Sequence, residues 1–332
     1  MSLLQYNPEQ DASVFLNTQV VIHGLQYEIS AGTTAGRSEP DSPQKPNEDA
    51  FRACIYPRTE YLAEATGIAV GVFDGASSQQ QIPELKGVSG ARFASHALGD
   101  IFIDEPITGD VRSTVSGLNQ ALGERFRGFA SVKWDDLNTL PTSTATVGQI
   151  DTTEHVLSVG HVGDSFGAAL MQDGSTRLLT NNLHRQYDEK VLQLILDIAN
   201  EEDITPREAR KDPRIRQAIM AMFQGTRNRP DGTGEGMVNG DPHMDQYIHT
   251  ESLPLRGVRA VLFGSDGLVP PSMDERKPGD REALFAITED VGVQGLIRYT
   301  REVEREDPDR WHIRYKHSDD ATGLLVTISD AS

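Results

Sequence analysis

The sequence predicts an α+β protein built from layers of strands and helices. Short runs that are rich in valine and bounded by glycine are typical of buried strands, and three such runs end in an aspartate beside a glycine. Apolar residues at helical spacing are grouped between the strand segments, and the order does not repeat as a strand–helix–strand unit. This order favours an α+β layered domain over a doubly wound parallel sheet.

The first part of the chain divides into an extension, a loop, strands and two helices. Residues 1–18 form the expected N-terminal extension, and clustered Gly, Ser, Pro and Asp predict a loop over residues 32–46. The segments expected next are strands over 51–56 and 68–74, helices over 88–101 and 111–129, strands over 144–150 and 156–164, and a hairpin over 167–180. The Asp173–Gly174 pair predicts the turn of that hairpin.

Residues 181–247 differ in character and are predicted to be an inserted flap. A helix is expected over residues 187–198. A second helix is expected after Thr205, because Thr205 and Glu208 match a capping box with proline at the first helical position. Residues 225–240 are rich in glycine and are predicted to lack regular structure.

After the flap the chain returns to the layered pattern. The expected segments are a strand ending at Asp266, one or two helices over 280–306 and a final strand over 323–328. Together with the earlier segments, they predict a single domain over residues 19–330 that carries the flap as an insertion.

Composition excludes several classes of protein. The chain has 332 residues, and 50 acidic against 31 basic residues give a net charge of -19, which argues against a nucleic-acid partner. No window approaches the roughly 18 consecutive apolar residues of a membrane helix. The N-terminus lacks the pattern of a secretory signal, and Cys54 is the only cysteine. We therefore expect a cytoplasmic protein with no membrane partner.

Carboxylates at the ends of the apolar runs predict a metal site. The five acidic points along the chain are Asp49, Asp74, Asp164, Asp266 and Asp319. A carboxylate at the end of a buried strand is costly, and several that converge would repel each other unless a cation compensates them. Oxygen ligands select Mg²⁺ or Mn²⁺, and no histidine spacing suggests zinc. Two such ions can activate water and hold a phosphoryl group.

Six ordered segments give the chain a resemblance to a known family. They are Asn47-Glu48-Asp49-Ala50, Val72-Phe73-Asp74-Gly75, Ser143-Thr144-Ala145-Thr146, Val162-Gly163-Asp164-Ser165, Gly264-Ser265-Asp266-Gly267 and Asp319-Asp320-Ala321-Thr322. With these motifs the chain resembles the PP2C-type (PPM) metal-dependent protein serine/threonine phosphatases, from about Val20 to Ile328. The sequence around Asp74-Gly75-Ala76 is closer to a bacterial branch of that family.

The resemblance implies a fold and a reaction. The fold is a four-layer α/β/β/α sandwich, in which helices flank a central antiparallel β-sandwich. The reaction is hydrolysis of phosphoserine or phosphothreonine in a protein substrate, by direct attack of a metal-bridging hydroxide and without a phospho-enzyme.

The resemblance also implies roles for site residues. Two Mn²⁺ or Mg²⁺ ions would be held by Asp49, Asp74, Asp266, Asp319 and the carbonyl of Gly75. Glu48 would act through a metal-bound water, and Asp164 with Asp266 would serve a third, weaker metal position.

The chain departs from the family pattern at three points. Ala76 stands where many relatives carry the histidine proposed as general acid, which predicts a preference for good leaving groups. The family's phosphate-binding arginine is missing before Glu48. Either Lys45 replaces it as a point charge, or Arg37 from the preceding loop binds the phosphate, and we favour Arg37. Asp320 replaces the usual asparagine; it either adds charge beside the metal or points away.

Two other functions remain open at this point. The chain could be a catalytically weak PP2C-like module that binds phosphoproteins, or a two-metal enzyme for small phosphate esters. The sequence does not predict the oligomeric state. Cys54 is expected to be a buried apolar residue, and residues 232–236 a mobile loop rather than a phosphate loop. His161 and His317 are expected to be hydrogen-bonded core residues.

Overall fold

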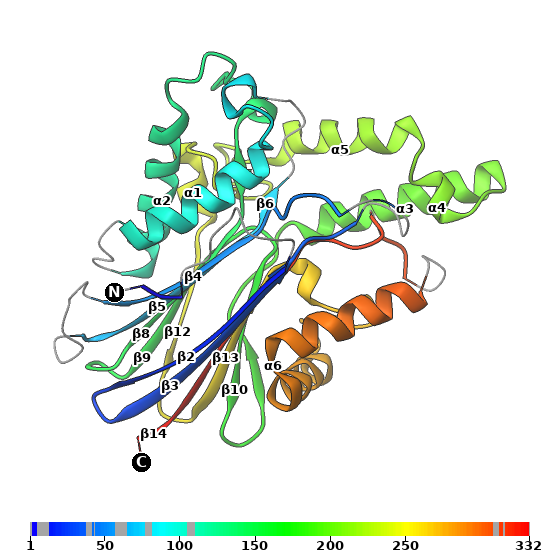
Figure 1. Ribbon diagram of the computed structural model, residues 1–332. Coiled ribbons are helices and arrows are strands. Elements are labelled where there is room, and N and C mark those ends of the chain that lie inside the picture. The colour runs from blue at the N-terminus through cyan, green and yellow to red at the C-terminus, as the bar shows by residue number, and fades with distance from the viewer. Residues whose placement is uncertain are drawn as a thin grey trace.

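Two antiparallel sheets packed face to face form the centre of the protein (Figure 1). The computed structural model describes residues 2–4, 13–37, 42, 44–56, 65–76, 82–104, 110–307, 312–314 and 316–331. The first sheet has the order β1 (Ser2–Leu4), β4 (Ala50–Tyr56), β5 (Gly67–Phe73), β8 (Ala145–Asp151), β9 (Val156–Val162), β12 (His249–Pro254). The second has the order β11 (Thr176–Leu178), β10 (Phe166–Met171), β13 (Val258–Gly264), β14 (Ala321–Asp330), β3 (Leu25–Thr34), β2 (Ser13–Ile22). A short pair, β6 (Gly75–Ala76) and β7 (Thr142–Ser143), lies apart from both.

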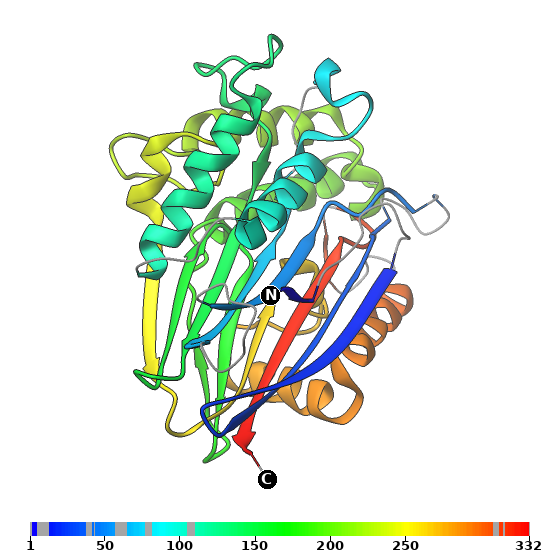
Figure 2. The ribbon, with the colours of Figure 1, turned by 60° about the vertical axis from the view of Figure 1, so that its left-hand side comes forward.

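Helices cover the outer face of each sheet. Helices α1 (Gly90–Asp104) and α2 (Val111–Phe126) pack on the first sheet, where Figure 2 shows them over its strands. Helix α6 (Pro278–Glu306) packs on the second sheet and is kinked at Gly292, where φ is 70°. The predicted α+β fold and its four α/β/β/α layers are therefore confirmed.

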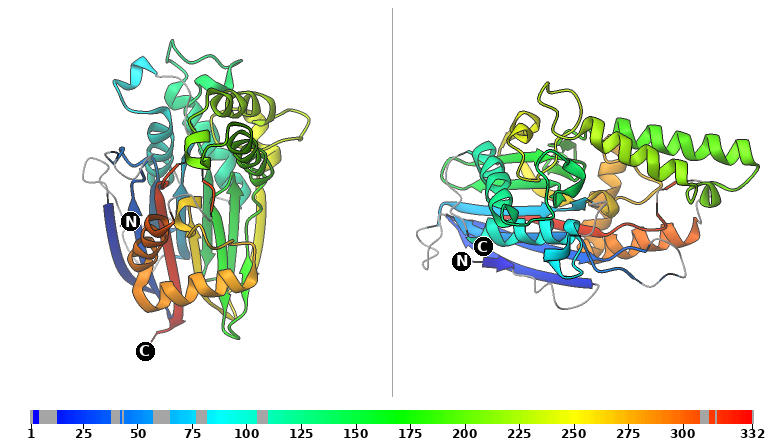
Figure 3. Two further views of the ribbon diagram at one scale, coloured as in Figure 1. Left: turned by 90° about the vertical axis from the view of Figure 1, so that its right-hand side faces the viewer. Right: turned by 90° about the horizontal axis from the view of Figure 1, so that it is seen from above.

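The flap segment, residues 181–247, contributes three helices beside one end of the sandwich. They are α3 (Arg185–Glu202), α4 (Pro206–Ala209) and α5 (Pro213–Thr226), and the view from above shows them extending beyond the sheets (Figure 3). Single turns of 3₁₀ helix occur at Pro83–Leu85, Leu137–Thr139, Pro242–Tyr247 and Asp266–Leu268. No described helix is both long and apolar enough to cross a membrane.

Several element predictions need correction. Strand β2 begins at Ser13, so the expected extension over residues 1–18 ends inside a strand that pairs along its whole length with β3. Strand β3 runs to Thr34, and the loop expected from residue 32 therefore begins later. The helix expected after Thr205 is divided into α4 and α5, and strand β12 was not predicted. Residues 227–240 lack helix and strand as expected, but Glu235 and Val238 are buried in them, so this part is packed.

Phe263 fills the space between the two sheets. Its side chain in β13 is fully buried, and a methyl group added to Gly148 of the opposite sheet would lie 2.5 Å from its ring. Glycine at position 148 therefore leaves the room that the phenyl ring occupies. The ring in turn excludes water from the centre of the sandwich.

We expect Phe263→Ala to lower the free energy of unfolding by about 3–5 kcal/mol, because it leaves a cavity between the sheets. Urea denaturation followed by circular dichroism measures this loss. Val21→Ala is the control, since Val21 is 51% exposed, and should change stability by less than about 0.5 kcal/mol. Equal losses in the two variants would contradict the assigned core.

Candidate functional site

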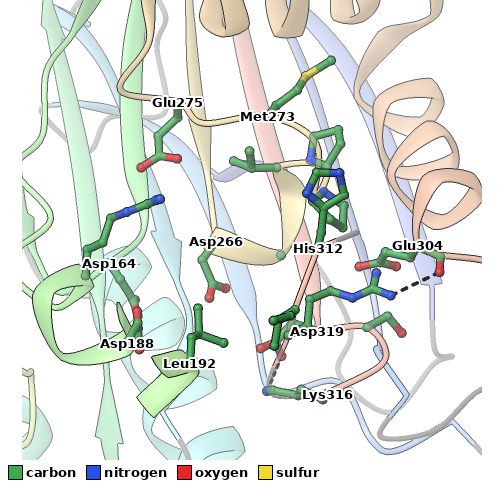
Figure 4. A pocket seen from close by; sticks show the side chains of 18 of the residues that line it. Asp164, Asp188, Leu192, Asp266, Met273, Glu275, Glu304, His312, Lys316 and Asp319 are labelled. Carbon is green, nitrogen blue, oxygen red and sulfur yellow. Dashed lines mark hydrogen bonds and ion pairs between the residues drawn. The ribbon is translucent and has the colours of Figure 1, made fainter. Parts of the chain in front are cut away.

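Five aspartates meet at one end of the β-sandwich. Asp49 directly precedes β4 and Asp74 directly follows β5, and the pairing of Ala50 with Phe73 puts both at the same edge of the first sheet. In the second sheet, the pairing of Gly264 with Gly323 likewise brings together the end of β13, before Asp266, and the start of β14, after Asp319. Figure 4 shows Asp164, Asp266 and Asp319 around one space.

The charge of this group is not balanced by hydrogen bonds. Asp49 is fully buried, and neither of its carboxylate oxygens has a partner in hydrogen-bond geometry in the described part of the chain. The nearby side chains of Ser265 and Thr322 lower its pKa, but by less than burial raises it. Burial and then the neighbouring Asp320 raise the pKa of Asp49 to about 7. Burial and then Asp49 raise the pKa of Asp74 well above its usual value, and burial and then Asp319 do so for Asp266. Such a cluster favours a bound cation.

Lys316 is the cation that the structure places beside these carboxylates. Its Nζ forms an ion pair with Asp319 Oδ1, and the side chain lines the space between Asp266 and Asp319 (Figure 4). Burial alone would raise the pKa of Asp319, but Lys316 and then Lys45 outweigh it and lower that pKa. Among the described residues, no group of three or more His, Cys, Asp or Glu side chains is arranged closely enough to hold a metal ion as it stands.

Backbone contacts hold the aspartates in place. The Asp74 carbonyl accepts hydrogen bonds from Ser143 Oγ and from the Thr144 backbone N–H, each at 2.8 Å. This contact gives the Ser143-Thr144 motif a structural role. The Asn47 side chain links Asp49 to the second sheet, because it accepts from the Asp49 N–H at 3.0 Å and donates to Thr33 at 2.6 Å.

Asp320 ties two loops together instead of facing open space. Its carboxylate accepts the backbone N–H of Gly36 at 2.6 Å and that of Glu48 at 2.8 Å, and its side chain is almost fully buried. Arg301 of α6 donates to the carbonyl of Asp319 and pairs with Glu304. Helix α6 thus supports the turn that carries Asp319.

The two predicted phosphate-binding cations lie outside the cleft. Lys45 Nζ contacts Glu48 at 2.9 Å and Asp320 at 3.5 Å. The exposed Arg37 side chain donates to the Ser42 carbonyl at 2.7 Å, and its backbone bridges to Ser318. Neither side chain is among those that line the cavities beside Asp266.

The cleft itself lies between the sandwich and the flap segment. One cavity of about 250 Å³ has Asp74, Gly75, Ala76, Asp266 and Asp319 on the sandwich side. On the flap side, Ile219, Met222 and Phe223 of α5 form an apolar wall, and Arg227 lies at its edge. A neighbouring cavity of about 270 Å³ lies between Asp266 and α3, and residues within 312–319 and Glu304 of α6 also line it.

A buried ionic cluster joins the flap segment to the sandwich. His184 Nδ1 contacts Glu235, and Nε2 lies 3.2 Å from Asp188 and 3.9 Å from Asp164. Burial disfavours the charged ring, but hydrogen bonds to Asp188 and Glu235 raise the pKa of His184 well above its usual value. Asp188, four residues after His184, is a local signal that sequence reasoning missed, whereas Glu235 is 51 residues away and could not be paired with it from the sequence.

The remaining sequence candidates have structural roles. Cys54 is a buried free cysteine in β4. His161 is buried, with Nδ1 3.0 Å from the Thr146 hydroxyl, and burial lowers its pKa to about 4. His317 is also buried. In the segment 232–236, Glu235 is fixed by His184, which argues against a loop that moves independently.

Comparison with known proteins identifies a family through a match to a family model, and similar solved structures share the fold. A family model described as Protein phosphatase 2C matches residues 38–295. A sex-determining protein of C. elegans is 15% identical with a TM-score of 0.52, over 90% of this chain and 64% of that chain. A bacterial serine phosphatase carrying one substitution is 15% identical with a TM-score of 0.50, over 92% and 98%.

A third similar structure is RsbX in complex with magnesium, which is 13% identical with a TM-score of 0.47, over 95% of this chain and 100% of that one. No curated protein is similar enough in sequence to count as a match. At these identities the similar structures show the fold alone, whereas the family model covers most of the chain.

Stability without metal should fall as the pH rises through about 7. Burial disfavours ionisation of Asp49 in the folded state and raises its pKa. The stability that the protonated Asp49 carboxyl contributes is therefore present at low pH and is lost above the folded-state pKa of about 7. In EDTA, the melting temperature of Asp49→Asn should exceed that of the wild type by a margin that grows from pH 5 to pH 8. A margin independent of pH would contradict the assigned burial.

We also expect Lys316→Met to tighten Mn²⁺ binding by roughly two- to fivefold, the equivalent of a part-exposed ion pair, because Asp319 is released from its ammonium partner. Isothermal titration calorimetry measures the dissociation constant. Lys190→Met, on the exposed side of α3, is the control and should leave it unchanged. Weaker Mn²⁺ binding in Lys316→Met would show that the lysine supports the metal site.

Proposed function

Because this chain belongs to the protein phosphatase 2C family, we propose that it is a divalent-metal-dependent phosphatase of phosphoserine and phosphothreonine in proteins. The observation that carries this proposal is the cluster of buried carboxylates, of which Asp49 has both oxygens without a hydrogen-bond partner among the described residues. A cluster of this kind has little use in packing, since each buried charge costs stability. Bound cations would offset this cost in stability.

The donor set fits two hard cations. The proposed ligands are the carboxylates of Asp49, Asp74, Asp266 and Asp319 and the Gly75 carbonyl, with Glu48 acting through water and Asp164 with Asp266 at a third, weaker position. All of these donors are oxygens, which suits Mg²⁺ and Mn²⁺. Such ions, when bound, lower the pKa of coordinated water and polarise phosphoryl oxygens.

The chain's own residues would orient the substrate and the ligands. Ser143 and Thr144 fix the backbone of Asp74, and Asp320 and Arg301 fix the turn at Asp319. With these supports, water would attack phosphorus directly, without a covalent intermediate on the protein. The apolar wall of α5 would contact residues that flank the phosphorylated side chain. Phosphate binding by Arg37 or Lys45 stays a prediction, since both side chains are engaged outside the cleft.

A second candidate function is a catalytically weak phosphoprotein-binding module. It is favoured by Ala76, which lines the cleft where many relatives have histidine, and by the ion pair between Lys316 and Asp319. If the protein is an enzyme, the absence of an imidazole at position 76 predicts faster turnover of aryl phosphates than of alkyl phosphates.

The test is phosphate release from a phosphothreonine peptide and from p-nitrophenyl phosphate, with Mn²⁺, Mg²⁺ or EDTA. We expect turnover that requires metal and that falls at least about 100-fold in Asp74→Asn, since even changes to outer-shell groups cost 10–100-fold. Asp173→Asn is the matched control, because Asp173 is an exposed aspartate in a hairpin turn.

The other outcomes of this test distinguish a small-ester phosphatase from a phosphoprotein-binding module. Turnover of the aryl ester alone would favour a small-ester phosphatase. No turnover by the folded wild type with any metal, together with binding of the phosphopeptide, would favour the binding module.

A further inference from the structure

A buried arginine in the flap segment has no partner for its charge. Arg227 follows α5 and is 3% exposed, and its Nε and Nη2 have no hydrogen-bond partner in the described structure. Its guanidinium stacks on the Phe223 ring, with 3.7 Å between Cζ and the ring centroid. Because the side chain also lines the cleft that contains Asp74 and Asp266, we propose that Arg227 binds the phosphoryl group of the substrate.

The nearest carboxylates do not neutralise this arginine. Glu235 is the first of two acidic groups whose charge acts on Arg227, but one of its oxygens contacts His184 and the other accepts from Thr226 at 2.9 Å. The second, Asp164, forms its ion pair with His184 instead. Burial outweighs both charges and lowers the pKa of Arg227 to about 10, which still leaves it protonated at neutral pH.

A phosphoryl group suits this position better than another occupant. A guanidinium presents a rigid fork of donors that matches two oxygens of a phosphate, and the stacking on Phe223 fixes the plane of the fork. The cleft is lined by two other basic side chains, His184 and Lys316, and both are paired with carboxylates. Among the described basic side chains that line this cavity, Arg227 is the one whose Nε and Nη2 have no hydrogen-bond partner.

Packing alone does not explain an arginine here. A buried cation without an ion-pair partner destabilises a fold, and an apolar side chain of similar length would pack on Phe223 without that cost. Unused donors beside a reactive centre are typical of groups that are satisfied only by a ligand. This inference rests on the proposed phosphatase function, and it supplies the phosphate-binding cation that Arg37 and Lys45 do not provide in the structure.

The experiment compares Arg227→Met and Arg227→Lys with the wild type, using Arg229→Met as the matched control. Arg229 lies two residues away, is exposed and pairs with Asp231 at 2.6 Å. We would measure KM for p-nitrophenyl phosphate with Mn²⁺, binding of inorganic phosphate to the Mn²⁺-loaded protein by calorimetry, and the melting temperature. Phosphate binding gives a readout that does not depend on turnover.

We expect Arg227→Met to weaken phosphate binding and raise KM about tenfold or more, the value of a hydrogen bond to a charged group. Its melting temperature should stay equal to that of the wild type or rise. Arg227→Lys should recover part of the phosphate affinity, because it keeps the charge and loses the fork, and Arg229→Met should match the wild type.

The inference and the proposed function fail in different ways. Unchanged phosphate affinity in a folded Arg227→Met, or a lower melting temperature with unchanged KM, would make Arg227 a structural residue while phosphatase activity stands. If the wild type hydrolyses no ester, the proposed function fails, and a loss of phosphate binding in Arg227→Met still supports the anion site. If Arg227→Met does not fold, Arg227→Lys decides. Equal phosphate affinity in Arg227→Lys and the wild type would show that the guanidinium does not bind phosphate through two donors and would overturn the inference.

Discussion

Repulsion among buried carboxylates is the constraint on which the rest of this structure depends. Strand ends from both sheets bring Asp49, Asp74 and Asp266 together. Beside burial, Asp49 raises the pKa of both Asp74 and Asp266, and Asp266 raises that of Asp74. Burial strengthens this repulsion because water is excluded. Lys316 and Lys45 offset part of the charge around Asp319, whereas no ion pair does so for Asp49 among the described residues, and Ser265 and Thr322 lower its pKa less than burial raises it. The fold therefore tolerates a local loss of stability at this end, which a bound cation would recover.

The backbone, and not contact between the carboxylates, keeps the site in place. Thr33 and Thr322 join neighbouring strands through a hydrogen bond of 2.6 Å, and Asn47 connects this pair to Asp49. Gly36 approaches the turn so closely that an added methyl group would lie 2.4 Å from the Ser318 carbonyl oxygen. Because the two sheets are rigid and the Asn47–Thr33 contact crosses between them, the carboxylates hold their positions despite their repulsion.

Much of the fold could be predicted from periodicity, and the aspartates from their place at strand ends. The capping box at Thr205 and Glu208 is present, although α4 ends after four residues because a new helix starts at Pro213. Strands β2 and β3 were missed despite alternating residues in Leu25–Thr34, a signal that was available. Lys316 and His184 have partners three and four residues away, Asp319 and Asp188, a local signal that was available. The contact of His184 with Glu235 and the burial of Arg227 depend on the tertiary fold and could not be predicted. The sequence left open whether Asp320 adds charge beside the metal or points away, because its backbone donors, the N–H groups of Gly36 and Glu48, could not be predicted.

The distribution of charge in the cleft bears on how a phosphorylated substrate would be recognised. A chain with a net charge of -19 repels a phosphorylated substrate at long range, so recognition needs cations near the reacting group. The sandwich side offers carboxylates, whose charge bound metal ions would reverse, and the flap side offers Arg227. A phosphoryl group between them would meet positive charge on both sides, and each side would remain unfavourable without it. On this proposal, the carboxylates with their bound metal ions and Arg227 would be two halves of one anion site, and the charges that the described residues leave incompletely balanced would be balanced when the substrate binds.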